Sequence, residues 1–553
     1  MHAAGFRIGW RLGLGAGLLV CGVALSGCGG GGEGGGGGDG SAEGDGGSGP
    51  STASMVEPMT AAFAQPDERP LLPWPACVPS GAGTDYAVGP GQPLASLDQV
   101  PWERLAPGDT VRIHYSATPY RGKFLLAAHG TATRPVRVCG VRGPNGERPV
   151  IDGQGATTSP GLLAAFAGSV SDILQRRALV MVTKLASDAW TDRPTYLQID
   201  GLKFTRAHPA YQFRDAAGAV KTYDAFGACI WVDRGDHVTI ADNELTDCAM
   251  GVFSRSADDG SGAVTENLRL VGNVIHGNGV VGSESEHSTY TQGLGVVIEH
   301  NVYGPLRAGA RGNAIKDRSA GLVVRYNRIE EGAHAIDLVE AEDFPLLVLP
   351  RADYRTTLVY GNQIRKDGDS GSVIHYGGDH AGSTPGALWG EPIFRKGVLQ
   401  FFHNTVIVTG KSAEVFQLST TEERAEVWNN AIVFASTVSE KSLRAGQSVG
   451  PLWVTGGVVH LGKNWLSIGW QDIDQWHTLT GQLLLAAAPL VGLRSPLVEG
   501  NWVPQPGSAL VDAAGPAPAG VAAVPILWQL DAVGRSQARV TKGAAPDLGA
   551  VEQ

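Results

Sequence analysis

The stretch IEHNVY at residues 298–303 decides the fold, because its pattern occurs seven times along the chain. Each copy has an apolar residue three places before an asparagine and an apolar or aromatic residue two places after it. The copies are IADNEL (240–245), LVGNVI (270–275), IEHNVY (298–303), VRYNRI (324–329), VYGNQI (359–364), FFHNTV (401–406) and VWNNAI (427–432). Successive asparagines are 30, 28, 26, 35, 42 and 26 residues apart. These intervals indicate a solenoid with one copy in each coil, because repeat proteins stack units of roughly 20–45 residues.

The asparagine has a mechanical reason to recur in such a solenoid. At a tight corner between two strands, Asn tolerates left-handed backbone angles and hydrogen-bonds to its own turn. In stacked coils these side chains can form a ladder, while the flanking Val, Ile and Leu point into a common core. The chain after residue 100 has short β-rich stretches, many turn residues and little helical periodicity. We therefore predict an all-β fold, a single-stranded right-handed parallel β-helix over residues 71–506.

Both ends of the predicted solenoid carry distinctive segments. Residues 94–105 are expected to form a short capping helix that covers the exposed end of the core. PGDTVRI (107–113) would start the first strand, and VIDG (150–153) would close a coil. Residues 507–553, which end in DLGAVEQ, are expected to fold back on the last coils as a C-terminal cap segment. These opening and closing segments resemble those of right-handed β-helix proteins of the pectate-lyase-like superfamily.

Residues 1–27 have the features of a lipoprotein signal peptide. A positively charged start is followed by an apolar run over 12–25, which is shorter than the ~20 residues that span a bilayer. LSGC at 25–28 resembles a bacterial lipobox. The resemblance implies cleavage before Cys28, a lipid anchor on its thiol and, because glycine follows, a place in the cell envelope at the outer membrane. The alternative is a simple secretory leader that is cut nearby.

Residues 28–70 are predicted to be a flexible Gly-rich tether, because such a composition cannot bury apolar surface. The formal net charge of the chain is −11. This balance argues against nucleic-acid binding, which needs a basic field. We expect the folded part to act as a monomer.

Four of the six cysteines lie after the leader and the lipobox cysteine, Cys28. In an exported protein, four such cysteines favour two disulfides. We pair Cys77 with Cys139 and Cys229 with Cys248, because each pair lies within neighbouring stretches. Buried free thiols are the alternative.

The strands that follow the asparagine corners can be aligned by one inward-pointing residue each. These residues are Val252, Thr289, Ile315, Ile336, Ile374 and Phe416. Because side chains alternate between the faces of a strand, the next residue of each strand should point outward. The outward column is Phe253, Tyr290, Lys316, Asp337, His375 and Gln417, and a second column two places on is Arg255, Gln292 and Arg318. Neighbours in such a column lie about 4.8 Å apart, within reach of one bound sugar.

Charge is also organised along this part of the chain. Residues 307–328 hold six basic side chains and one acidic one, whereas residues 330–343 hold six acidic side chains and no Lys or Arg. A basic strip beside an acidic strip suits a uronic-acid polymer held partly through Ca²⁺, with Asp337 and Glu340 as candidate oxygen ligands. The alternative is that these charges pair across coils as surface salt bridges worth ~0–1 kcal/mol each.

These features predict a surface-anchored, carbohydrate-active protein, with a polysaccharide lyase as the preferred class. Such an enzyme cleaves an acidic polysaccharide by β-elimination. Arg318 or Ca²⁺ would neutralise the uronate carboxylate. Lys316 is expected to be the base, because the neighbouring Arg318 should help its ammonium to lose a proton. Tyr290 or His287 would be the acid or a substitute base.

A resemblance supports these catalytic roles. HSTY (287–290) and GNAIKDR (312–318) are similar to a His-x-x-Tyr and Lys-x-Arg pattern of β-helix proteins. Lyases of this fold use Lys and Arg from outward positions, so the resemblance favours Lys316 and Arg318. The side chains expected to bind the substrate are Asp337, His375, Gln292, Arg255 and Phe253.

Two other function classes remain open on the sequence. A glycoside hydrolase on the same fold would need two carboxyl groups at a defined separation, for which Asp337 with Asp317 or Glu340 could serve. A non-catalytic surface module that binds polysaccharide could use Trp231 and Phe253 as stacking platforms.

Overall fold

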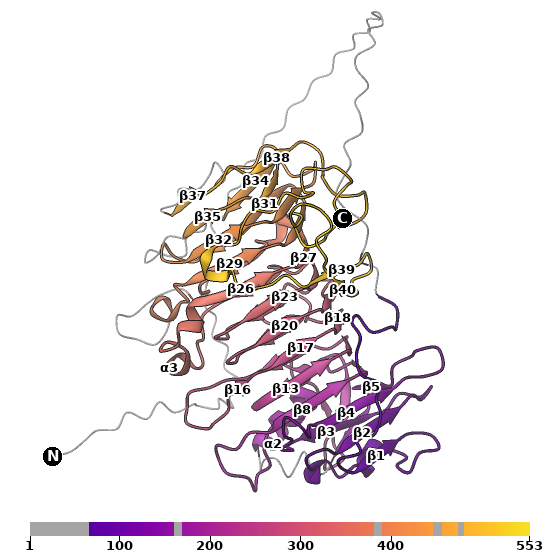
Figure 1. Cartoon of the computed structure of the whole chain (residues 1–553). Helices are drawn as coiled ribbons and strands as arrows, with labels where there is room; N and C mark the ends of the chain where they lie inside the picture. The colour runs from indigo at the N-terminus through magenta and orange to yellow at the C-terminus, as the bar shows by residue number, and fades with distance from the viewer. Residues whose placement is uncertain (1–62, 64–65, 160–168, 381–389, 446–455, 474–480) are drawn as a thin grey trace, which may run out of the picture. The chain divides into compact units, whose positions relative to one another are not determined.

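The structure is a computed structural model that describes residue 63 and residues 66–159, 169–380, 390–445, 456–473 and 481–553 (Figure 1). The predicted signal peptide, its Cys28 and most of the predicted tether lie outside the described residues. In the part of the chain that is described, no helix has the length and apolar character that a membrane crossing requires.

Three long sheets run side by side along the body, and the chain visits each of them once per coil (Figure 1). The 14-stranded sheet contains β1 (Asp85–Val88), β2 (Thr110–His114), β4 (Val136–Val141), β8 (Thr195–Asp200), β13 (Gly235–Ala241), β16 (Thr265–Glu266), β17 (Arg269–Val271), β20 (Val297–Glu299), β23 (Val323–Arg325), β26 (Thr356–Tyr360), β29 (Val398–Phe402), β32 (Arg424–Trp428), β35 (Val458–Leu461) and β37 (Gln482–Leu485). The 11-stranded sheet contains β5 (Val150–Asp152), β9 (Lys203–Thr205), β14 (Glu244–Thr246), β18 (Val274–His276), β21 (Val302–Tyr303), β24 (Arg328–Glu330), β27 (Gln363–Asp367), β30 (Thr405–Thr409), β33 (Ala431–Phe434), β36 (Trp465–Ser467) and β38 (Leu490–Gly492).

The 13-stranded sheet carries the predicted site. It contains β11 (Val220–Thr222), β10 (Gln212–Arg214), β6 (Ala156–Thr158), β3 (Gly122–Leu126), β7 (Ala178–Val182), β12 (Ala228–Val232), β15 (Val252–Ser254), β19 (Thr289–Thr291), β22 (Ile315–Asp317), β25 (Ile336–Leu338), β28 (Ile374–Tyr376), β31 (Ser412–Leu418) and β34 (Glu440–Arg444). Strands of successive coils pair in parallel, as β19 does with β22 and β22 with β25. The predicted parallel β-helix is therefore confirmed.

Helical segments are few and short among the described residues. They are η1 (Leu97–Gln99), η2 (Trp102–Arg104), α2 (Ser169–Arg177), α3 (Pro345–Val348), η3 (Ala352–Arg355), η4 (Gly368–Ser370), η5 (Glu391–Ile393) and η6 (Ala519–Val521). The predicted capping helix over 94–105 is wrong, because two 3-10 turns, η1 and η2, replace it. Pro101 lies between them, and proline interrupts an α-helix because it lacks a backbone N–H and clashes with the preceding turn. The apolar side chains still join the core, where Trp102 stacks on Phe124.

The asparagines of the repeat form a buried ladder at the corners between the 14-stranded and 11-stranded sheets. Asn327 is typical. Its Oδ1 accepts hydrogen bonds from the backbone N–H of Asn301 at 2.9 Å and from Nδ2 of Asn301 at 3.0 Å. Its own Nδ2 donates to the carbonyl of Ile298 at 2.9 Å and to Oδ1 of Asn362 at 3.0 Å. The ladder extends beyond the seven repeats to Asn464, which accepts from Asn430 in the same way.

The corner differs from the prediction in one detail. The left-handed backbone angle belongs to the residue before each asparagine and not to the asparagine itself. These residues are Asp242, Gly272, His300, Tyr326, Gly361, His403 and Asn429. The left-handed residue turns the chain, and the asparagine that follows is then free to bond to neighbouring coils.

Both terminal segments of the described chain pack along the side of the solenoid. In the C-terminal segment, β39 (Trp528–Leu530) and β40 (Ser536–Ala538) form an antiparallel pair. This segment reaches past the last coils, because Arg328 donates to the carbonyl of Ala532 at 2.9 Å. Phe63 and Leu71 pack with Val302, so the last part of the predicted tether belongs to the folded body.

The two predicted disulfides are both present. Cys77–Cys139 joins the segment before β1 to β4, and Cys229–Cys248 joins β12 to the turn after β14.

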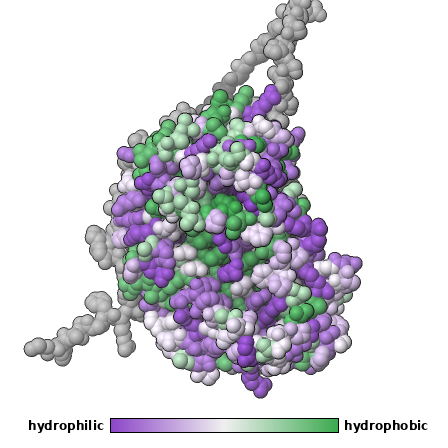
Figure 2. Space-filling view, in the orientation of Figure 1, coloured by the Kyte–Doolittle hydropathy of each residue, from purple (hydrophilic) through white to green (hydrophobic). Residues whose placement is uncertain are grey.

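At the C-terminal end of the 14-stranded sheet, Leu484 and Leu485 of β37 are exposed. Figure 2 shows hydrophobic residues at this upper end of the body, where β37 and β38 lie in Figure 1.

The ladder predicts a large effect of a single substitution. We expect Asn327→Ala to lower the free energy of unfolding by at least about 1–3 kcal/mol, because it leaves buried N–H groups of Asn301 without an acceptor. Asn145→Ala is the control, since its side chain bonds only at an exposed turn, and should change stability by less than about 0.5 kcal/mol. Urea denaturation followed by circular dichroism measures both; equal effects would contradict a stabilising ladder.

Candidate functional site

Strand pairing brings the predicted outward residues into one column on the 13-stranded sheet. Phe253 pairs with Tyr290, Tyr290 with Lys316, Lys316 with Asp337, and Asp337 with His375. Gln417 follows as the partner of His375. This is the register that the apolar alignment predicts, so residues more than 100 positions apart in the chain line one face.

The column lies along two adjacent clefts. The larger, of about 870 Å³, is lined by Asn313, Lys316, His334, Asp337 and His375, among others. The smaller, of about 380 Å³, is lined by Phe253, His287, Tyr290, Gln292 and Arg318, among others. Lys316 and Asp379 line both clefts and therefore lie at their junction.

Lys316 does not have the properties of the predicted base. Its Nζ lies 2.9 Å from Oδ2 of Asp337 and also contacts Oδ2 of Asp379. Burial lowers the pKa of Lys316, but these two carboxylates outweigh burial and Arg318, so the pKa is raised overall. Lys316 is therefore an ammonium group that binds anions, and the predicted effect of Arg318 is overcome.

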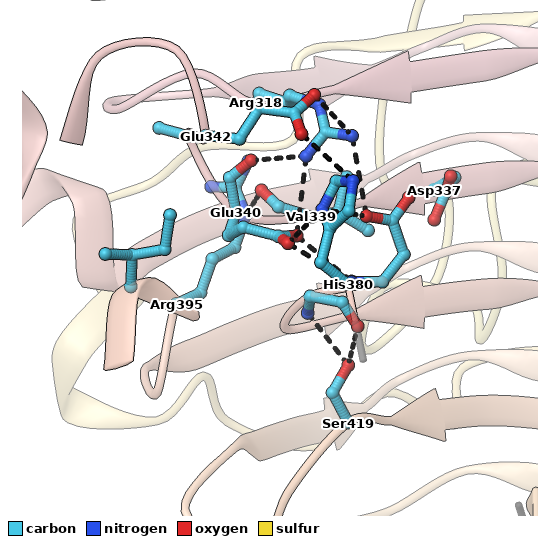
Figure 3. Close-up of polar contacts among 12 residues, drawn as sticks. Arg318, Asp337, Val339, Glu340, Glu342, His380, Arg395 and Ser419 are labelled. Atoms are coloured by element: carbon cyan, nitrogen blue, oxygen red, sulfur yellow. Dashed lines mark hydrogen bonds and ion pairs between the residues drawn. The ribbon is translucent and has the colours of Figure 1, made fainter. Parts of the chain in front are cut away.

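Arg318 and Tyr290 form a second charged centre beside Lys316. Arg318 Nε donates to the Tyr290 hydroxyl at 2.6 Å. Its Nη1 donates to the carbonyl of Glu340 at 2.6 Å (Figure 3). Its Nη2 lies 3.1 Å from Oε1 of Glu342. Burial raises the pKa of Tyr290, although Arg318 and Lys316 oppose the rise, so this phenol stays protonated at neutral pH.

His287 is held as a neutral ring. Burial, helped by the nearby Lys316, lowers its pKa to about 3. Its Nδ1 accepts a hydrogen bond from the backbone N–H of Asn313 at 2.9 Å, which leaves the proton on Nε2. In this tautomer His287 is a hydrogen-bond donor and not a base.

Asp337 is the most heavily bonded carboxylate of the column. Its Oδ2 accepts from Lys316 and from Asn313 Nδ2 at 2.7 Å, and its Oδ1 lies 2.8 Å from Nδ1 of His375. Burial raises the pKa of Asp337, but Lys316 and His375 outweigh burial and lower it well below its usual range. On its other side His375 Nε2 contacts the Ser419 hydroxyl at 3.0 Å.

Three functional neighbours were not predicted from the sequence. Asp379, which lines both clefts, and His380, which contacts Asp379, follow β28 and reach the site only through the fold. Asp379 contacts Lys316 and lies 3.4 Å from Arg318, so its pKa is lowered below its usual range although burial opposes this. His334 lies two residues before Ile336, the first residue of β25, and burial lowers its pKa to about 4. Strand alternation does not single out His334, because it lies three residues before Asp337.

The predicted substrate-binding residues are not equally accessible. Phe253 is buried among Trp231, Phe226 and Tyr290, so neither Phe253 nor Trp231 is an open stacking platform. Gln292 is also buried, where its Nε2 donates to Asp343 at 2.7 Å. Asp337 and His375 line the larger cleft.

Arg255 lies at the edge of the predicted second column. It is half-buried and pairs with Asp233 and Asp259. Its guanidinium is therefore engaged by two carboxylates of its own region. Its predicted role in substrate binding stays a prediction.

The basic side chains of residues 307–328 lie on different faces of the solenoid. Arg325 pairs with Glu299 at 2.6 Å on the 14-stranded sheet, and Arg328 lies under the C-terminal segment. Lys316 and Arg318 face the clefts. The predicted alternative, in which these charges pair across coils, therefore describes much of the run.

The residues do not fit the predicted calcium site. Two groups of side chains have ligand atoms within 4.8 Å of one another: His334, Asp337 and His375, and separately Glu340, Asp379 and His380. Asp337 and Glu340 thus belong to different groups, and each group contains imidazole. Calcium prefers six to eight oxygen ligands. Asp317, a predicted hydrolase partner of Asp337, is fully buried against Arg395 and Ser319 and does not reach the cleft.

Comparisons with known proteins find similar architectures and no related sequence. No family model matches the chain, and no curated protein does. Pectate lyase Pel9A is 11% identical, with 85% of this chain and 97% of that one covered and a TM-score of 0.38. The lacto-N-biosidase from Eubacterium ramulus is 12% identical, with 74% of this chain and 68% of that one covered and a TM-score of 0.33. The alginate lyase from Paenibacillus sp. is 13% identical, with 69% of this chain and 93% of that one covered and a TM-score of 0.22. Likeness at this level carries no argument about activity.

The charge on His380 predicts a pH-dependent contribution of this side chain to stability. Its ring contacts Glu340, Glu342 and Asp379, and these hydrogen bonds outweigh burial and raise its pKa to about 11. The stabilisation is complete below the ordinary histidine pKa of about 6.5 and is lost as the pH rises toward about 11. We expect the difference in melting temperature between the wild type and His380→Ala to shrink steadily over this range.

The control for this series is His129→Ala. His129 is half-exposed and pairs with one carboxylate, Asp192, so its removal should change the melting temperature little at any pH. A wild-type advantage over His380→Ala that grows with pH would contradict the interpretation.

Proposed function

We propose that this protein is a polysaccharide lyase that acts on an acidic, uronate-containing polymer. The observation that carries the proposal is the position of the Asp379 carboxylate, which bridges Lys316 and Arg318 where the two clefts meet. These two cations therefore form a cradle that already holds a carboxylate. A uronate of the substrate offers the same group to the same cradle.

In this proposal Lys316 and Arg318 neutralise the carboxylate of the bound sugar. Neutralisation makes the C5 proton easier to remove, because the negative charge that develops is stabilised by nearby cations. Tyr290 is a protonated phenol beside Arg318, and it donates its proton to the leaving oxygen as the C4–O bond breaks.

The proton acceptor in this proposal is Asp379. A substrate carboxylate that takes its place separates Asp379 from the two cations that lower its pKa. Its basicity then returns beside the sugar, where it accepts the C5 proton. The C4–C5 double bond forms, and one proton has moved to Asp379 and one from Tyr290.

The acid–base properties of the two carboxylates at Lys316 favour a lyase over a glycoside hydrolase. A hydrolase needs one carboxyl group that stays protonated at the working pH beside a second that is ionised. The two carboxylates at Lys316 are Asp337 and Asp379, and the pKa of each is lowered. Both are therefore anions, and neither is suited to protonate a leaving group.

The test uses the purified chain with a panel of alginate, pectate and glycosaminoglycan. We expect at least one polymer to yield products with unsaturated ends that absorb in the ultraviolet. Lys316→Ala should lower this rate by about 100-fold or more, as removal of a charge-stabilising group commonly does. Lys203→Ala is the matched control, because Lys203 pairs with Glu244 on the 11-stranded sheet.

Two results would count against the proposal. Reducing ends without ultraviolet absorbance would indicate a hydrolase, and binding of a polymer without cleavage would indicate a non-catalytic surface module. Full activity of Lys316→Ala would reject the assigned cradle.

We further propose that the protein is held at the outer membrane of the cell envelope by a lipid on Cys28. The support is the lipobox-like LSGC at 25–28 and the Gly-rich stretch that follows. In a double-membraned bacterium fed labelled fatty acid, the wild type should carry the label and fractionate with outer membranes. Cys28→Ser should lose the label, whereas Cys21→Ser should keep it; a labelled Cys28→Ser variant would contradict the proposal.

A further inference from the structure

We infer that His334, Asp337 and His375 form a binding site for one divalent transition-metal ion in the larger cleft. Their candidate ligand atoms all lie within 4.8 Å of one another. Asp337 and His375 are paired neighbours on β25 and β28, and His334 lies two residues before Ile336, the first residue of β25. All three side chains line the cleft of about 870 Å³.

The hydrogen bonds around the two histidines indicate which ring nitrogen of each remains for an ion. Nδ1 of His334 contacts the Ser372 hydroxyl at 2.8 Å, which leaves Nε2 for an ion. Nε2 of His375 contacts the Ser419 hydroxyl at 3.0 Å, which leaves Nδ1 beside Oδ1 of Asp337. Both serines are fully buried. Metal-binding histidines commonly have their second nitrogen held in this way by an outer partner.

The carboxylate is oriented by the same principle. Oδ2 of Asp337 is occupied by Lys316 and Asn313, so Oδ1 is the oxygen that remains for the ion. An ion would replace the hydrogen bond between Asp337 and His375. The site thus has three ligands, each held in place by a neighbour that is not itself a ligand.

The donor set decides the class of metal. Two imidazoles and one carboxylate suit Zn²⁺, Mn²⁺ or Fe²⁺, whereas Ca²⁺ and Mg²⁺ prefer oxygen ligands. Three protein ligands beside an open cleft leave further coordination positions for water or a substrate oxygen.

The second group, Glu340, Asp379 and His380, is less suitable. Both ring nitrogens of His380 already contact carboxylates, and Arg318 contacts both Glu340 and Asp379. The ring of His380 and both carboxylates of this group are therefore already engaged by one another or by Arg318.

Metal binding by the purified full chain tests this inference without any polymer, so its outcome is independent of the lyase proposal. Chelator-treated protein is dialysed against Zn²⁺, and bound metal is measured by mass spectrometry. We expect about one equivalent of Zn²⁺ to be retained, while Ca²⁺ is not. Co²⁺ in place of Zn²⁺ should give visible absorption bands from the coordinated ion.

The variants separate this site from its neighbour. His334→Ala should lose Zn²⁺ retention and the Co²⁺ bands, and Ser372→Ala should weaken Zn²⁺ binding about 10–100-fold because it removes an outer partner. His380→Ala is the matched control, a histidine of the other group in the same region, and should bind Zn²⁺ like the wild type.

Circular dichroism establishes that each variant is folded, and Ser372→Ala makes the smallest change if His334→Ala does not fold. Wild-type protein that retains no more Zn²⁺ than His334→Ala would overturn the inference. Zn²⁺ binding that survives in His334→Ala and Ser372→Ala but is lost in His380→Ala would overturn it equally.

Discussion

Each buried asparagine of the ladder bonds to a neighbouring coil, and this contact aligns the corners between the 14-stranded and 11-stranded sheets from Asn243 to Asn464. Asn327 accepts from Asn301 and donates to Asn362, so three successive coils are joined at one corner. A strand that slipped by one residue would turn its apolar side chains outward and break the ladder at once. Backbone hydrogen bonds alone could not impose this register, since they tolerate shifts along a strand.

The site depends on that register. Tyr290, Lys316, Asp337 and His375 come from four coils, and they share a face only because their strands pair residue against residue. Once aligned, they compensate one another: the ammonium of Lys316 lies between two carboxylates, and the guanidinium of Arg318 lies against Glu340 and Glu342. Buried charges need such partners, because an unpaired charge in this environment would be very costly.

The pairing also changes what each group can do. A lysine beside an arginine is expected to have a lowered pKa. The two carboxylates around Lys316 reverse that effect and raise its pKa. Two histidines on neighbouring coils meet one aspartate, and a buried serine fixes each ring from behind. The cleft therefore combines a cationic cradle for a carboxylate with a cluster of nitrogen and oxygen donors.

The sequence by itself determined the solenoid, the disulfide pairs and the column from Phe253 to Gln417. Local rules suffice there, since a repeated corner and the alternation of a strand specify which residues stack. Only the tertiary structure decided that Phe253 is buried, that Asp379 enters the cleft and that His380 pairs with Asp379. The reason is physical: protonation and exposure depend on partners brought in by loops, whose paths no repeat or periodicity encodes.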